Sequence, residues 1–145
     1  MTTTAVRNRI QLGRKIEGIS AVLLPFENDG RIDFDSFAQN VKRTLDAGIA
    51  PAVNMDTGYT NFLTPDERRE VLKATREVCG GKSFVAGAFV EGLVGDPLKL
   101  YQEAVAEIQA TGGTPILFQC SAFKKLSRVP LVEFYKAVAA SCEKM

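Results

Sequence analysis

Histidine is absent from the 145-residue chain, and this absence limits the chemistry that the chain can perform. A Ser-His-Asp or Cys-His nucleophile is excluded, and so are the histidine-rich zinc sites. Any reaction must therefore rely on Lys, Tyr, Asp, Glu, Ser, Thr, Cys or the backbone.

Cysteine is scarce as well. Cys79, Cys120 and Cys142 are far apart, odd in number and without CxxC spacing. This pattern predicts neither a disulfide framework nor a zinc site. We interpret the three residues as small, partly buried hydrophobic side chains.

An excess of charge and long apolar runs are also lacking. The net charge is +1, which gives no reason to expect a nucleic-acid partner. A basic cluster in residues 1–17 forms an N-terminal leader, interpreted as a solvated tail or first helix; it holds Arg7, Arg9, Arg14 and Lys15. No apolar run has the length of a signal peptide or a membrane span, so we expect a cytoplasmic protein with no membrane partner.

Four short apolar runs are each followed by a helical pattern. The runs cover residues 18–26, 49–53, 83–90 and 115–120. The expected helices begin after the N-caps Asp33, Thr64 and Asp96, and at Pro130. The strand starts, at Ile19, Ile49, Ser83 and Pro115, recur every 30 to 34 residues.

This repeat predicts an α/β fold with a parallel sheet over residues 18–145, because strands so apolar need both faces covered. A (β/α)8 TIM barrel uses about 250 residues, or about 31 per unit. The four βα units therefore correspond to the first half of such a barrel. Four strands cannot close a barrel, which leaves three possibilities: half of a larger protein, two copies completing each other, or an open doubly wound sheet like flavodoxin.

The loop after the second strand is the strongest candidate site. Thr57 lies beside Gly58, where we expect the backbone to turn sharply and expose its amides as a cradle for a carboxylate or phosphate. The helix start that follows is strong, with Thr64 at the N-cap, Pro65 at the first position and Glu67 completing a capping box. The alternative is an ordinary βα connection with a glycine turn.

In parallel α/β folds the active site lies at the carboxyl ends of the strands. Two hypotheses follow. In the first, Thr57 and neighbouring amides hold a substrate carboxylate while an amine forms a Schiff base with the adjacent ketone. In the second, the carboxylates Glu27, Asp56 and Glu91 gather around a Mg²⁺-type ion. Solvated loop charges are the alternative for each carboxylate.

Three motifs, in this order and spacing, resemble the dihydrodipicolinate synthase and N-acetylneuraminate lyase family of class I, pyruvate-dependent aldolases. Residues 21–34 are similar to the family's "TPF" strand followed by "DG.ID". Residues 55–68 are similar to its Gly-Thr-Thr-Gly-Glu loop followed by Leu-Ser/Thr-x-x-Glu-Arg, and residues 84–87 to its "VIAG" strand.

The resemblance implies specific roles and specific departures. Thr57 and Gly58 match the part of the loop that binds the pyruvate carboxylate. Asp56 replaces a threonine of a proton relay, and Tyr59 replaces the loop glutamate. Phe123 occupies the position of a catalytic tyrosine and has no hydroxyl to move a proton.

The family's Schiff-base lysine falls beyond Met145. Lys124 and Lys125 lie in the matching loop of this chain, where a desolvated lysine could be nucleophilic; solvated loop charges are the alternative. The candidate catalytic residues are therefore Asp56, Tyr59 and Lys124, and no cofactor is implied.

The resulting hypothesis is a lyase that binds a 2-oxo acid such as pyruvate and makes or breaks a C–C bond, or dehydrates a sugar acid. Its nucleophilic lysine would lie outside this chain, so the chain alone should be inactive, and the complete protein is expected to be a homo-oligomer. Two alternatives stay open: a catalytically dead half-barrel used for binding or assembly, and a metal-dependent lyase that uses Glu27, Asp56 and Glu91.

Overall fold

The computed structural model describes residue 13 and residues 16–142, so the basic cluster of the leader lies outside the described residues. The strands are β1 (Ile19–Ala21), β2 (Ala50–Val53), β3 (Val85–Ala88) and β4 (Thr114–Leu117). The α-helices are α2 (Phe34–Asp46), α3 (Pro65–Cys79), α4 (Pro97–Ala110) and α5 (Arg128–Ala139). Two 3₁₀ helices, η1 (Asp56–Gly58) and η2 (Ser121–Lys125), follow β2 and β4.

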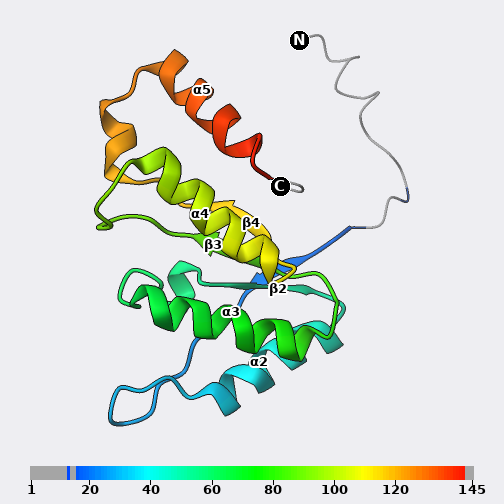
Figure 1. Cartoon of the computed structure of the whole chain (residues 1–145). Coiled ribbons are helices and arrows are strands. Elements are labelled where there is room, and N and C mark those ends of the chain that lie inside the picture. The colour runs from blue at the N-terminus through cyan, green and yellow to red at the C-terminus, as the bar shows by residue number, and fades with distance from the viewer. Residues whose placement is uncertain (1–12, 14–15, 143–145) are drawn as a thin grey trace.

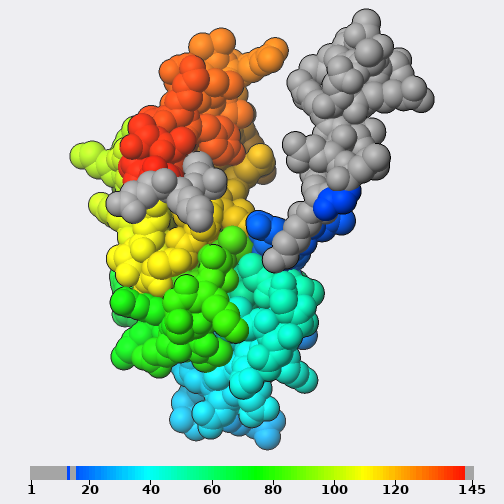
Figure 2. All heavy atoms as spheres, turned by 90° about the vertical axis from the view of Figure 1, so that its right-hand side faces the viewer, coloured from blue at the N-terminus to red at the C-terminus, as the bar shows by residue number. Residues whose placement is uncertain are grey.

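The sheet is parallel and its strand order equals the chain order, β1-β2-β3-β4. Helices α2, α3 and α4 lie along the same face of the strands, stacked in chain order from α2 at one end of the molecule to α5 at the other (Figures 1 and 2). A doubly wound sheet reverses its strand order at a switch point, and this sheet does not. The flavodoxin-like alternative is therefore wrong, and the four units are the first half of a TIM barrel.

Local sequence signals set the helix starts. Asp33 accepts a hydrogen bond from the Ser36 amide at 2.9 Å at the start of α2. The predicted capping box is present at α3, where the Thr64 amide donates to the Glu67 carboxylate at 2.7 Å and the Glu67 amide donates to the Thr64 hydroxyl at 3.2 Å. Helix α5 begins at Arg128, two residues before the expected Pro130, because a proline is tolerated in the first turn, where its amide has no partner.

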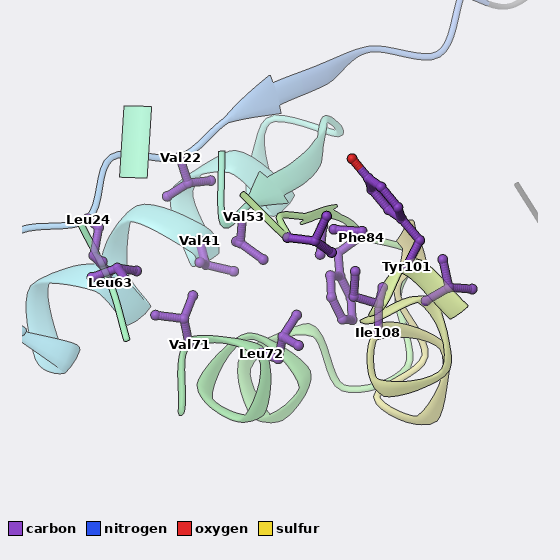
Figure 3. Packing of buried hydrophobic residues seen from close by; sticks show 14 of the residues in the cluster. Val22, Leu24, Val41, Val53, Leu63, Val71, Leu72, Phe84, Tyr101 and Ile108 are labelled. Carbon is purple, nitrogen blue, oxygen red and sulfur yellow. The ribbon is translucent and has the colours of Figure 1, made fainter. Parts of the chain in front are cut away.

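The core lies between the sheet and the helices (Figure 3). Val53 of β2 faces Val41 of α2, while Val105 of α4 is fully buried. Gly87 lets β3 pass close to the end of β2, since a Cβ there would lie 2.2 Å from the carbonyl oxygen of Asn54. The core thereby fixes the carboxyl ends of β2 and β3 relative to each other.

The prediction of a buried strand over residues 18–26 is wrong in extent and burial. Only Ile19–Ala21 forms a strand, and 59% of Ile19 is exposed. After it, Val22 and Leu24 are buried while Leu23 is 64% exposed. The reason is that β1 pairs only with β2 among the described residues, so its other edge has no neighbour.

Cys79 and Cys120 are buried and Cys142 is half-buried, which confirms their interpretation as buried or partly buried side chains; all three thiols are free. Across the described part of the chain, no helix combines the length and the apolar character needed to cross a bilayer.

Candidate functional site

The four βα loops gather along one edge of the sheet, at the carboxyl ends of the strands, on the left in Figure 1. Two of these loops carry 3₁₀ helices, η1 after β2 and η2 after β4. All the predicted site residues lie in these loops. The chain topology therefore brings them to the same edge.

The backbone of the η1 loop is turned by Asn54 and Tyr59, which have left-handed φ values of 52° and 54°. Gly58 is buried, and its amide donates to the Met55 carbonyl at 2.9 Å. The chain turns at Gly58 as predicted, but the prediction that the turn exposes the Gly58 amide is wrong. A Cβ at Gly58 would meet only ordinary contacts, with Leu24 Cβ and the Val22 oxygen at 3.7 Å.

Polar side chains of η1 remain at the surface. Asp56 and Thr57 are exposed, and the Thr57 hydroxyl makes no hydrogen bond within residues 16–142. Tyr59 is 48% exposed and packs edge-on against Phe26, with ring centroids 5.9 Å apart. Asp56, Thr57 and Tyr59 thus form an accessible polar rim, in which the hydroxyls of Thr57 and Tyr59 are without a hydrogen-bond partner among the described residues.

The η1 loop is fastened to α3 by contacts that the sequence did not predict. The Asn54 side-chain amide donates to the Arg68 carbonyl at 3.1 Å. The Arg68 guanidinium donates to the carbonyl oxygens of Thr60 at 3.1 Å and Leu63 at 2.6 Å. In the sequence, Arg68 is distinguished only by its match to the family motif, which carries no information about these partners.

Lys124 lies at a second place on the same edge. It lines a cavity of about 440 Å³ with six other residues, namely Glu91, Gln119, Cys120, Ser121, Phe123 and Leu131. Hydrogen bonds from the side chain and the amide of Ser121, with a smaller effect of the Lys124 charge, lower the pKa of Glu91. Residues 56–59 do not line this cavity, so the structure does not join Lys124 to the η1 rim.

Another cavity, of about 700 Å³, lies at the opposite edge of the sheet, where α3 and α4 end and the chain enters β3 and β4. Its lining includes Arg76, Gly81 and Gly112. In parallel α/β folds the chemistry occurs at the carboxyl ends of strands. We therefore assign the candidate site to the smaller cavity and the η1 rim.

Phe123 has a packing role. It is 8% exposed and stacks on Tyr101, with centroids 5.6 Å apart, while Phe134 contacts it edge-on at 4.8 Å. The Phe123 ring therefore joins η2 to α4 and α5 through hydrophobic contacts.

The magnesium hypothesis is not supported by the geometry. No group of three or more acidic, cysteine or histidine side chains is arranged to hold a metal ion within the part of the chain that is described. Glu91 instead accepts a hydrogen bond from the Ser121 amide at 2.6 Å. The prediction that Glu27, Asp56 and Glu91 gather around a cation is wrong.

The sequence profile of the Dihydrodipicolinate synthetase family matches residues 15–144. The chain belongs to this family. It is 32% identical over 123 residues to a 4-hydroxy-tetrahydrodipicolinate synthase of Bdellovibrio bacteriovorus, covering 84% of this chain and 40% of that protein. A synthase of the same name from Campylobacter jejuni is 30% identical over 132 residues, which cover 88% of this chain and 42% of that protein.

Solved structures of Dihydrodipicolinate synthetase family members share the fold. Dihydrodipicolinate synthase from Oceanobacillus iheyensis gives a TM-score of 0.72 at 23% identity, covering 88% of this chain and 42% of that one. The Acinetobacter baumannii enzyme complexed with pyruvate gives 0.74 at 21% identity, covering 88% and 43%. A structure described as the first monomeric dihydrodipicolinate synthase variant gives 0.73 at 22% identity, covering 89% and 42%. The chain thus spans about two fifths of the length of these relatives.

Proposed function

We propose that the complete protein is an aldolase-type lyase that binds a 2-oxo acid such as pyruvate at the η1 rim. The observation that carries this proposal is the exposed Thr57 hydroxyl at the carboxyl end of β2, in a family member whose loop matches the family's at Thr57 and Gly58. The proposal includes a cytoplasmic location, a homo-oligomeric protein and a small-molecule substrate.

The chemistry follows from the 2-oxo acid itself. A neutral lysine amine attacks the ketone carbon, and the carbonyl oxygen leaves as water when the imine forms. The protonated imine then accepts electrons from the bond that breaks, or stabilises the carbanion that attacks an acceptor. In this scheme Thr57 donates to the substrate carboxylate, while Asp56 and Tyr59 are the proton-handling groups of the rim.

The nucleophile is proposed to lie outside residues 1–145, and the chain itself tests this. We expect that mixing the 145-residue chain with pyruvate and borohydride leaves its intact mass unchanged. A stable covalent adduct would contradict this expectation. If Lys124→Arg then abolished the adduct, the nucleophile would be Lys124.

Substrate binding can be tested separately from covalent chemistry. Pyruvate titrated into the chain should shift the NMR signals of the η1 loop, and Thr57→Val should weaken binding about tenfold, the value of one hydrogen bond to a charged group. Thr111→Val is the matched control, because its hydroxyl bonds the Ile108 carbonyl at the opposite edge of the sheet. Equal affinity of wild type and Thr57→Val would overturn the proposed site.

The exposed edge of β1 favours a second candidate, a half-barrel that acts as an assembly module. Such a protein would cover its open edges with a second copy or another subunit. Analytical sedimentation separates the two candidates. A self-completing half-barrel should form a discrete dimer, whereas a part of a longer enzyme should associate through its open edges without a fixed stoichiometry.

A further inference from the structure

Arg68 is an arginine of α3 whose side chain is directed at the backbone of the η1 loop. Its guanidinium donates to the carbonyl oxygens of Thr60 and Leu63. The guanidinium carbon also lies 5.5 Å from the centroid of the Phe89 ring, at the carboxyl end of β3. One side chain therefore connects the loop after β2 to the end of the neighbouring strand.

The charge of Arg68 is not neutralised by a carboxylate. Within residues 16–142 Arg68 forms no ion pair, whereas the adjacent Arg69 pairs with Asp66 and Glu107. Partial burial lowers the pKa of Arg68, although an arginine remains protonated at any pH at which the protein is folded. Its positive charge therefore contacts the carbonyl oxygens of the loop, beside the proposed binding site of an anionic substrate.

The backbone of the same residue is fastened to β2. The Asn54 side-chain amide donates to the Arg68 carbonyl, and Asn54 is 4% exposed in a left-handed conformation. The segment between Asn54 and Arg68 is thus closed at its ends, as in a compact Ω-loop. Arg68 takes part in the closure through both its main chain and its side chain.

We propose that Arg68 is a positioning residue, which fixes residues 56–63 so that the Thr57 hydroxyl is presented to the substrate carboxylate. The part of this inference that concerns the substrate rests on the proposed function, whereas the part that concerns the loop does not. One guanidinium nitrogen, Nη1, donates to both carbonyl oxygens, and the planar group also lies over the Phe89 ring. A lysine ammonium could donate to the two oxygens, but it offers no planar group to stack on the ring. The geometry therefore calls for arginine rather than for any cation.

Hydrogen exchange of single amides tests the loop part without a ligand. In Arg68→Met the amides of Gly58, Tyr59 and Thr60, which are hydrogen-bonded within the loop, should exchange about tenfold faster, while β3 keeps its protection. Arg69→Met is the matched control and should leave the loop unchanged. Faster exchange throughout the molecule would show a merely structural role and overturn the proposal.

A conservative variant separates charge from geometry. Arg68→Lys keeps the positive charge and should restore the protection of the loop only in part. Complete restoration would overturn the argument that the planar guanidinium over Phe89 is needed to hold the loop.

Pyruvate affinity tests the functional part. If wild type binds pyruvate, Arg68→Met should raise Kd by about tenfold, and an unchanged Kd alongside faster loop exchange would overturn the positioning role. If wild type does not bind pyruvate, the proposed function fails, and the exchange data still decide whether Arg68 fixes the loop.

Discussion

Asn54 and Tyr59 take the left-handed conformation at the two ends of the η1 turn. Asparagine tolerates this region, whereas for tyrosine it costs on the order of 1 kcal/mol. The packing of Tyr59 against Phe26 and the closure of the loop by Arg68 hold the strained backbone in place. Strain is therefore concentrated where the polar rim is presented.

Thr60 provides a test of buried polar groups in this loop. It is fully buried, and its hydroxyl has no hydrogen-bond partner among the described residues. Because an unsatisfied buried hydroxyl is unfavourable, Thr60→Val should raise the free energy of unfolding by about 1 kcal/mol, measured by urea denaturation. A decrease would show that a buried water serves the hydroxyl.

Thr75 is the matched control for this prediction. It is equally buried, but its hydroxyl donates to the Val71 carbonyl at 2.7 Å. Thr75→Val should therefore lower the free energy of unfolding by about 0.5–1.5 kcal/mol.

At the residue scale, sequence predicted what depends on close neighbours in the chain. The capping box of Thr64 and Glu67 followed from a spacing of three residues and is confirmed. The left-handed Tyr59 was missed because propensity disfavours it. The partners of Arg68 were missed because two of them are backbone carbonyl oxygens, which have no sequence signal, and the contact with Phe89 depends on packing between elements.

At the scale of elements, an aromatic contact joins α4 to η2. Tyr101 of α4 stacks on Phe123 of η2, and its hydroxyl donates to the carbonyl of Phe118 just after β4. Burial raises the pKa of Tyr101 far above its usual range, so the hydroxyl stays protonated and able to donate. The contact therefore places the loop that carries Lys124.

Tyr101→Phe should remove the hydroxyl while keeping the stacked ring. The expected loss is about 1–2 kcal/mol of unfolding free energy, because the carbonyl of Phe118 would lose its buried donor. Urea denaturation measures the loss. Tyr135→Phe is the control, since Tyr135 contacts Phe123 but its hydroxyl makes no hydrogen bond in the described part of the chain; equal losses in both variants would contradict the prediction.

The elements themselves were predicted with different success. Helices α2, α3 and α4 follow from caps and apolar spacing, which are local signals. The burial of β1 was predicted wrongly, because exposure depends on whether another strand lies beside it. Composition alone cannot distinguish a central strand from one at an edge.

At the scale of the whole molecule, several carboxylates share the same acid dependence. Hydrogen bonds from Ser36 lower the pKa of Asp33, those from Thr64 lower that of Glu67, and those from Ser121 lower that of Glu91. A lowered pKa in the folded state gives stability that is present above the unfolded value and lost as pH falls through the folded one.

We therefore expect the free energy of unfolding to change little from pH 7 to 5 and to fall below about pH 4.5. Denaturant titrations across this range measure the effect. Glu67→Gln should be less stable than wild type at pH 7 and should lose less on acidification. Parallel pH profiles for the two proteins would contradict the assignment of part of the acid dependence to Glu67.

The open edge of β1 predicts how the 145-residue chain behaves in solution. Unpaired strand edges with exposed apolar side chains promote association, and 59% of Ile19 is exposed. Ile19→Lys should shift sedimentation toward the monomer, while Val94→Lys, at a fully exposed loop position, should not. A monomeric wild type would contradict the prediction.

The period of the βα units predicted the fold of the molecule as a whole, because 30 to 34 residues is the length of one barrel unit. What faces β1 and β4 across their open edges could not be predicted from the same pattern. Half a barrel has the same repeat as a complete one.

The agreement between strand order and chain order also affects how the protein can be made. Each strand pairs only with the strands next to it in the sequence, so each new unit finds its docking edge already synthesised. During translation the N-terminal part of a chain folds first. The half-barrel can therefore grow one βα unit at a time as it leaves the ribosome, with its newest strand always at the growing edge.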